Sequence, residues 1–204
     1  MNWIQESVKR SNKLKDHYKM QEIDIFIKDQ LPSHIDPDLV FSTFSKLIPS
    51  HLLTGVDIVY VGQFDVFKQK QTNAVFQDGA IYVSNEQDSN QDMIDDIIHE
   101  LAHSVEEKFT QYIYDENDLK NEFVGKRKRL YDILLNYDYD PSPKLKTVYH
   151  YDEKIDMYLY KDVGYEAMWN LINGLFPSPY SATSLREYFA IGFEYYFMGE
   201  KNTI

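Results

Sequence analysis

The residues best suited to chemistry in this chain are two histidines and a glutamate in the segment His99-Glu100-Leu101-Ala102-His103. On a helix of 3.6 residues per turn, positions four apart lie on one face, so both imidazoles can bind one Zn²⁺ at about 2.0–2.1 Å. Glu100 then lies where it can take a proton from a zinc-bound water and pass it to a leaving amine. The spacing therefore predicts a metal site that supports hydrolysis.

The residues around the motif matter, because the motif itself occurs by chance in roughly one of every hundred chains of this length. Apolar side chains around it recur at helical spacing, which predicts an amphipathic helix. They are Ile94, Ile97, Ile98, Leu101 and Val105. Asn90 or Ser89 is the expected N-cap. We therefore interpret the two histidines as metal ligands rather than as solvated side chains.

The composition narrows the class of protein. The chain has 204 residues, a length that suits one domain with a substantial core. It contains no cysteine, which fits a cytoplasmic protein without disulfides. We find neither the apolar core of a signal peptide nor an apolar run long enough for a membrane helix. We therefore expect a cytoplasmic location and no membrane partner. Export by another route stays open.

The net charge bears on the expected partners. A net charge of −12 argues against nucleic acid, because phosphates favour clustered Lys and Arg. The same charge favours a basic protein or peptide substrate. The oligomeric state cannot be deduced from the sequence.

The elements before the motif predict a small sheet flanked by helices. Residues 1–30 read as a helical N-terminal extension that ends before Pro32. A second helix begins at Asp36-Pro37 and runs to about Leu47. A β-rich run between Gly55 and Gly62 follows, and then the strands Asn73–Gln77 and Ala80–Ser84, which Asp78-Gly79 joins as a hairpin.

The elements after the motif are mainly helical. We expect helices over residues 117–137, 165–175 and 184–198. Between them, the tyrosine-rich residues 147–160 alternate in part and favour a hairpin. No repeat or low-complexity linker marks a boundary, so we predict a single domain over residues 1–204.

Two histidines do not complete a catalytic zinc site, which usually takes three protein ligands and leaves the fourth position to water. The metzincin pattern would place a third histidine six residues after His103. Position 109 is instead Phe109, and Glu106 replaces the glycine of that pattern. The metzincin family is therefore excluded by its own motif.

The remaining choice for the third ligand is a carboxylate from a separate helix. The C-terminal helix offers Glu187 and Glu194, seven residues apart and near one face. Ser184 and Glu187 also fit a capping box, in which the glutamate caps the start of its own helix. From the residues alone both glutamates stay open, with Glu187 favoured and with His150 and Asp152 as outside candidates.

The run Tyr180-Ser-Ala-Thr-Ser-Leu-Arg-Glu-Tyr-Phe-Ala-Ile-Gly-Phe193 resembles the signature of the anthrax lethal factor catalytic domain family, which includes the clostridial Pro-Pro endopeptidases. The resemblance implies that Glu187 binds zinc and that Tyr180, seven residues earlier, faces the metal. The positions of Ala190 and Phe193 also agree. It covers Tyr180 to Phe197 and the helix with the two histidines, a minor part of the chain. The resemblance implies an α+β, zincin-like fold with an edge strand beside the active-site helix. Our candidate for that edge strand is Asn73–Gln77. This strand either pairs with the substrate backbone or is part of an ordinary hairpin that binds no ligand.

The chain departs from that family in two ways. Ile191 stands where relatives have a second glutamate that supports the site, so the support comes from Glu194, Asp95 or Asp96, or is absent. The interval before the third ligand is also longer than in relatives, and we take residues of about 138–162 as an insertion. Minimal zinc peptidases that cut phage repressors are a related alternative, but they lack the matched tyrosine.

These observations predict a zinc-dependent endopeptidase. His99, His103 and Glu187 are expected to hold Zn²⁺, Glu100 to act as general base and then acid, and Tyr180 to donate a hydrogen bond to the oxyanion. The alternative is a catalytically weak or inactive zincin scaffold that serves as a binding or structural module. The missing second glutamate and the insertion favour that alternative, and the intact Glu100 argues against it.

Overall fold

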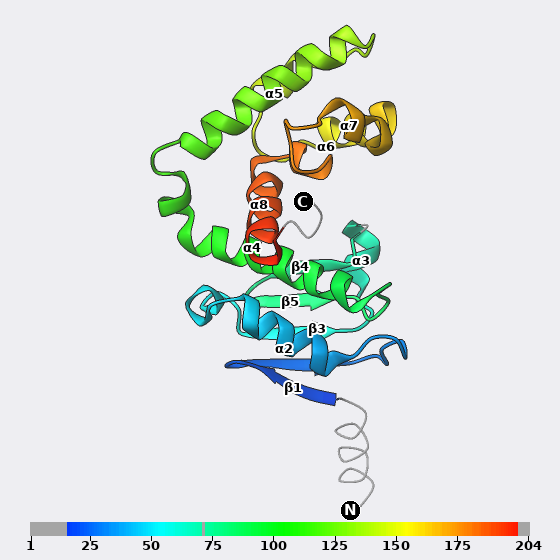
Figure 1. The fold of residues 1–204 in the computed structure, drawn as a ribbon, viewed down its shortest axis with the longest axis vertical. Helices are drawn as coiled ribbons and strands as arrows, with labels where there is room; N and C mark the ends of the chain where they lie inside the picture. Colours follow the sequence, from blue (N-terminus) through cyan, green and yellow to red (C-terminus); the bar gives the residue numbers. More distant parts are fainter. Residues whose placement is uncertain (1–15, 71, 200–204) are drawn as a thin grey trace, which may run out of the picture. The chain divides into compact units, whose positions relative to one another are not determined.

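A computed structural model describes residues 16–70 and 72–199 (Figure 1). The chain divides into two compact units, which we call the sheet unit (residues 1–105 and 197–204) and the helical unit (residues 106–196). The prediction of a single domain over residues 1–204 stays a prediction, since compactness alone does not test it. No helix of the described ranges is long and apolar enough to cross a membrane.

The sheet unit contains a five-stranded mixed sheet. Its strands are β1 (Asp16–Met20), β2 (Ile23–Ile27), β3 (Ile58–Val61), β4 (Ala74–Gln77) and β5 (Ala80–Val83), in the order β1-β2-β3-β5-β4. The three inner strands are parallel, whereas the two edge strands pair antiparallel. The structure therefore confirms the mixed sheet of an α+β protein and places the predicted edge strand at its edge.

The β4–β5 hairpin forms at the predicted turn. Asp78 and Gly79 both have positive φ, 51° and 78°, as a two-residue type I′ turn requires. Gln77 pairs with Ala80 across this turn. Local turn chemistry was sufficient to predict this element.

The prediction of a helical N-terminal extension over residues 1–30 is wrong for the part that the structure describes. Residues 16–27 form the antiparallel β1–β2 hairpin, and residues 1–15 lie outside the described residues. In β2, Ile23, Ile25 and Ile27 are buried while the residues between them are half-buried. That alternation has the period of a strand, and burial against the sheet decides the conformation.

Helices α2 (Pro37–Leu47) and α3 (Asp65–Lys70) complete the sheet unit together with the first part of α4 (Asn90–Tyr114), which continues into the helical unit. A 3₁₀ turn, η1 (Ser50–Leu53), follows α2. The predicted start of α2 is confirmed, because the Asp36 side chain accepts a hydrogen bond from the Leu39 amide at 3.2 Å.

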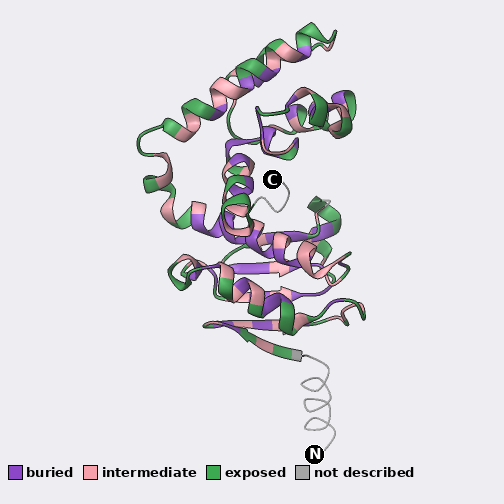
Figure 2. Cartoon of the chain, viewed as in Figure 1, coloured by how far each residue is buried: buried purple, intermediate pink, exposed green. Residues whose placement is uncertain are grey.

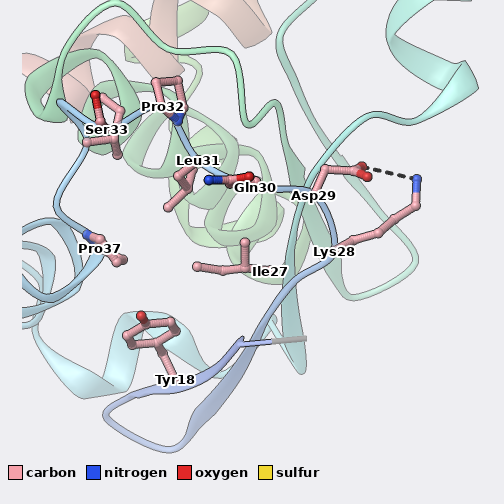
Figure 3. Close-up of a pocket in the computed structure, with 10 residues that line it drawn as sticks. Tyr18, Ile27, Lys28, Asp29, Gln30, Leu31, Pro32, Ser33 and Pro37 are labelled. Atoms are coloured by element: carbon pink, nitrogen blue, oxygen red, sulfur yellow. Dashed lines mark ion pairs between the residues drawn. The ribbon is translucent and has the colours of Figure 1, made fainter. Parts of the chain in front are cut away.

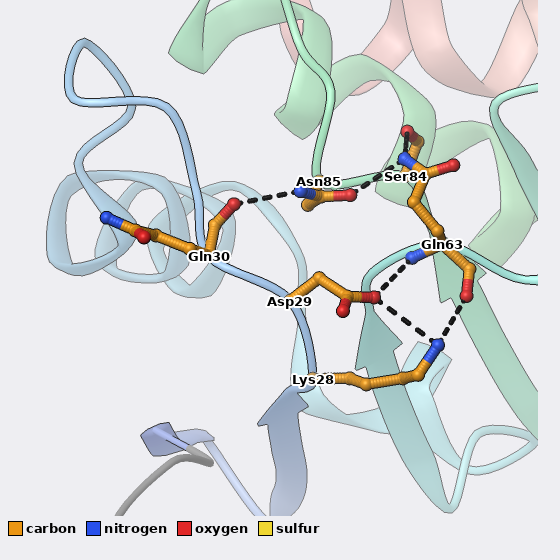
Figure 4. Close-up of polar contacts among 6 residues, drawn as sticks. All are labelled: Lys28, Asp29, Gln30, Gln63, Ser84 and Asn85. Carbon is orange, nitrogen blue, oxygen red and sulfur yellow. Dashed lines mark hydrogen bonds and ion pairs between the residues drawn. The ribbon is translucent and has the colours of Figure 1, made fainter.

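A polar network joins the loops that follow the three parallel strands (Figure 4). The Gln63 amide donates to Asp29 Oδ2 at 2.8 Å, and Gln63 Nε2 donates to Asn85 Oδ1 at 2.7 Å. Lys28 Nζ donates to the Gln63 carbonyl at 2.6 Å and pairs with Asp29 at 3.3 Å. These polar groups satisfy one another and hold the three strand ends together.

The helical unit confirms the mainly helical C-terminal part. Its helices are α5 (Asp118–Asn136), α6 (Glu153–Met157), the π-helix η3 (Tyr158–Gly164), α7 (Tyr165–Leu171) and α8 (Leu185–Met198), whose last two residues count with the sheet unit. Two short 3₁₀ turns, η2 (Pro143–Lys146) and η4 (Tyr180–Ala182), lie between them. The helices predicted at 117–137 and 184–198 are present, and α7 ends four residues before its predicted end.

The predicted hairpin over residues 147–160 is wrong, since this segment leads into α6 and η3. Asp152 caps α6 by accepting hydrogen bonds from two amides of its first turn, at 3.0 and 3.3 Å. Ile155, Leu159 and Val163 recur every four residues and are all buried. The tyrosines between them concealed this helical period. The status of residues 138–162 as an insertion stays a prediction.

Arg127 of α5 is a buried cation that organises the helical unit. Its side chain is 1% exposed and donates to four backbone carbonyls. Two belong to Leu145 and Val148, and two belong to Ala182 and Thr183, directly before α8. Burial lowers the pKa of Arg127 to about 10, so the guanidinium remains protonated near neutral pH.

We expect Arg127→Met to lower the free energy of unfolding by about 3 kcal/mol or more, because each buried carbonyl left unpaired costs about 1–3 kcal/mol. Urea denaturation measures the change. The exposed neighbour Lys128→Met is the control and should change stability by about 0.5 kcal/mol or less. Equal stability of the two variants would show that these carbonyls find other partners.

Candidate metal centre

Helix α4 presents His99, Glu100 and His103 from its sheet-unit part. The helix begins where Ser89 Oγ accepts a hydrogen bond from the Asp92 amide at 3.1 Å. Of the two predicted N-caps, the structure therefore selects Ser89. Asn90 has another role, since its Oδ1 accepts from the Asp36 amide at 2.8 Å.

Burial of the apolar residues of α4 orients the motif. The predicted apolar positions are all buried, as is Met93 (Figure 2): they are Ile94, Ile97, Ile98, Leu101 and Val105. The imidazole centroids of His99 and His103 lie 4.9 Å apart with their planes at 87°. His103 is 6% exposed, and His99 is half-buried. The two rings are therefore neighbours on one side of a well-packed helix.

Glu100 is held by the edge strand. Its side chain is 7% exposed, and its Oε2 accepts a hydrogen bond from the Phe76 amide at 2.6 Å. A backbone donor satisfies the carboxylate and fixes its orientation without neutralising its charge. The predicted edge strand β4 thus lies beside the motif helix, while its use by a substrate stays a prediction.

The acidic residues that precede the motif have partners of their own. Asp96 Oδ2 accepts from Gln87 Nε2 at 2.9 Å, and Asp95 Oδ1 accepts from Gln91 Nε2 at 3.1 Å. Burial raises the pKa of Asp96 to about 6; the Gln87 hydrogen bond opposes this shift and the charge of Glu100 adds to it. Asp96 is therefore a half-buried acid one turn before the general base predicted from the sequence.

Glu187 lies in the first turn of α8, within the helical unit. Its amide donates to Ser184 Oγ at 3.2 Å, so the serine half of the predicted capping box is present. The Leu185 amide donates to the Tyr149 carbonyl at 2.7 Å, which fixes the start of the helix. Both bonds restrict the position from which the Glu187 side chain extends.

Three of the predicted residues form a group with metal-binding character. Ligand atoms of His99, His103 and Glu187 all lie within 4.8 Å of one another. Two imidazoles and one carboxylate are a donor set that zinc accepts, so the residues fit this metal. Of the two glutamates left open by the sequence, Glu187 belongs to this group and Glu194 does not.

The outside candidates His150 and Asp152 are not part of this group. His150 is exposed, and Asp152 is engaged as the cap of α6. Ile191, at the position of the second glutamate in the lethal factor family, is 9% exposed. An apolar side chain occupies this buried position, so residue 191 of α8 offers no carboxylate to support the metal ligands.

Tyr180 is the first residue of η4 and is 40% exposed. Its carbonyl accepts hydrogen bonds from the Thr183 amide at 3.0 Å and from Thr183 Oγ1 at 2.7 Å. These bonds form a tight turn directly before α8. The catalytic role of its hydroxyl group stays a prediction.

Sequence reasoning missed two groups near Glu187 in the helical unit. Asp156 accepts a hydrogen bond from the Tyr151 hydroxyl at 3.2 Å. Burial raises the pKa of Asp156, and the charge of Glu187 raises it further. Burial also raises the pKa of Tyr165, with added contributions from the charges of Asp156 and Glu187. The tyrosine-rich composition was the one signal in the sequence, and it did not identify these residues.

Two hollows in the described part of the chain contain none of the predicted site residues. One, of about 650 Å³, lies in the sheet unit between β2 and the start of α2, and Figure 3 shows its lining, including the Lys28–Asp29 ion pair. The other, of about 410 Å³, lies along α8 and is lined mainly by aromatic rings, among them Phe189 and Phe193.

No protein-family model, curated protein or solved structure matches this chain. The resemblance to the lethal factor family therefore stays a prediction, based on the motif helix and on Tyr180 to Phe197. The function has to be argued from the chemistry of the site itself.

The metal-free protein should lose stability as pH rises from about 4 to about 6. Because the pKa of Asp96 is raised from 3.8 to about 6 on folding, the folded state binds more protons than the unfolded chain between these values. A shift of this size corresponds to about 2–3 kcal/mol. Urea denaturation between pH 4 and 8 should show this loss in the wild type and a smaller one in Asp96→Asn. The exposed Glu107→Gln on the same helix controls for net charge, and parallel profiles for all three proteins would contradict the assignment.

Proposed function

We propose that this chain is a zinc-dependent endopeptidase in which His99, His103 and Glu187 bind Zn²⁺. The observation that carries the proposal is the grouping of their ligand atoms within 4.8 Å. Catalytic zinc sites take three such ligands and keep one position for water or substrate. Glu100, adjacent to the first histidine, supplies the carboxylate that peptide hydrolysis needs.

We further propose that the fold is of the zincin type. The sheet is mixed, its edge strand β4 lies beside α4, and a mainly helical part follows. This arrangement agrees with what the resemblance to the lethal factor family implies. The third ligand comes from the mainly helical part, as the resemblance also implies.

The chemistry of hydrolysis is divided among a few groups. When bound, Zn²⁺ supplies a Lewis acid that lowers the pKa of a water ligand toward neutrality. Glu100, held by the Phe76 amide, accepts a proton from the attacking water and then donates it to the leaving amine. Tyr180 donates a hydrogen bond to the oxyanion that develops on the substrate carbonyl. The assignment of Tyr180 rests on its spacing from Glu187.

The substrate we propose is a protein or peptide, with basic sequences favoured by the net charge of −12. Strand β4 offers a short edge for pairing with it. Two backbone groups along β4 already have partners, since Phe76 donates to Glu100 and the Ala74 carbonyl accepts from Thr72 Oγ1 at 2.9 Å. A substrate strand must therefore pair with the few groups that remain or displace these bonds.

Replacement of each candidate glutamate by glutamine tests which one binds zinc. Glu187→Gln should weaken zinc binding by about 100-fold or more, because a neutral amide is a far poorer zinc ligand than a carboxylate. Glu194→Gln, on the same helix, should leave the affinity within about a factor of two and is the matched control. Zinc affinity is measured by competition with a chelator of known affinity. A larger loss in Glu194→Gln than in Glu187→Gln would overturn the assignment.

Glu100→Gln tests the reaction. The amide keeps the size of the side chain and can still accept the Phe76 hydrogen bond, but it cannot accept a proton from water. We expect cleavage of a peptide library to fall by about 10²–10⁴-fold, with zinc content and thermal stability retained. Glu107→Gln should cleave as the wild type does. A wild-type protein that binds zinc and cleaves no peptide would favour the binding or structural module instead.

A further inference from the structure

Helix α4 bends a few residues after the second histidine. Phe109 has φ −113° and ψ 20°, outside helical values. Thr110 Oγ1 donates to the carbonyls of Glu106 and Glu107, at 2.5 and 3.1 Å. A hydroxyl that bonds to the carbonyls of the preceding turn is a known cause of helix bending. The bend therefore has a local origin in the sequence.

Tyr114 and Glu106 lie on either side of the bend and contact each other through their side chains. The Tyr114 hydroxyl donates to Glu106 Oε1 at 2.6 Å, although the two residues are eight apart. In a straight helix their Cα atoms would be separated by about 12 Å along the axis. Burial raises the pKa of Tyr114, and the Glu106 carboxylate raises it further, so the phenol remains a donor at neutral pH.

The second oxygen of Glu106 pairs with α8. Arg186 Nε lies 3.5 Å from Glu106 Oε2, and Arg186 immediately precedes Glu187. The Glu106 side chain is 14% exposed and that of Arg186 is 51% exposed. Glu106 thus has a partner on each carboxylate oxygen, and its partial burial makes it less screened than an exposed carboxylate.

We propose that Glu106 is a positioning residue of the metal centre. It lies three residues after His103 on α4 and pairs with Arg186, the residue before Glu187 on α8, so it joins the two helices that carry the proposed ligands. Glu106 touches neither metal nor substrate and acts through Arg186 and Tyr114. The proposal deepens the proposed zinc site and rests on it for its functional meaning.

Zinc affinity tests this role with a matched pair of variants. Glu106→Gln removes the charge and keeps the shape, and Glu107→Gln makes the same charge change at the exposed neighbour. We expect a loss of about 10-fold in the first and about 2-fold or less in the second, by analogy with groups that orient ligands from outside the metal shell. Arg186→Gln should weaken binding similarly, and adding it to Glu106→Gln should cost little more.

A metal-free measurement separates this proposal from the zinc proposal. The chain has no cysteine, so Asp38→Cys and Lys128→Cys place two spin labels at exposed positions of the sheet unit and the helical unit. Without metal, the distance distribution between the labels should broaden in Glu106→Gln and keep its width in Glu107→Gln. Thermal unfolding verifies that each labelled protein is folded, and Tyr114→Phe replaces Glu106→Gln if the latter does not fold.

The outcomes are distinct. Broadening together with weaker zinc binding supports the positioning role. An unchanged width overturns it, even when zinc binding weakens, because the loss is then a charge effect. If the wild type binds no zinc, the proposed function fails. A broader distance distribution in Glu106→Gln would then still show that Glu106 limits motion. An unchanged width would overturn both the zinc proposal and the positioning role.

Discussion

The site depends first on the burial of one apolar face of α4. Ile97, Ile98 and Leu101 are fully buried, and each such side chain contributes about 1.5–3 kcal/mol relative to exposure. Rotation of the helix about its axis would expose these residues, so packing fixes which face the remaining positions occupy. His99 and His103, four residues apart, are thereby set side by side. The spacing of the two histidines and the spacing of the buried apolar residues both follow the period of the α-helix.

A second constraint is the cost of placing carboxylates near this packed helix. Glu100 is buried and is satisfied by the amide of Phe76 on the edge strand. Asp96 is half-buried, and the raised pKa of its carboxyl group means that the ionised form is disfavoured there. The hairpin therefore has a role beyond completing the sheet, since its outward amide orients the group that we propose as the general base.

In the helical unit, polar contacts from α5 fix the first turn of α8. Arg127 binds the carbonyls that precede this turn. The Tyr188 hydroxyl accepts from Lys126 Nζ at 2.5 Å and donates to Glu122 Oε1 at 2.8 Å. Together with the ion pair between Arg186 and Glu106, these contacts surround the helix start from which Glu187 extends. Long-range side-chain contacts of this kind leave little trace in sequence periodicity.

The sequence by itself determined the features that depend on neighbouring residues: the histidine spacing, the cap of α2, the turn at Asp78-Gly79 and the helical character of α4, α5 and α8. It failed at residues 16–27 and 147–160, where burial against distant parts of the chain decides between strand and helix. The tertiary structure alone brought Asp156 near Glu187 and paired Glu106 with Arg186, because these residues are far apart in the sequence. The physical reason is that local spacing specifies which side chains share a face, whereas contacts between distant segments depend on how those faces pack.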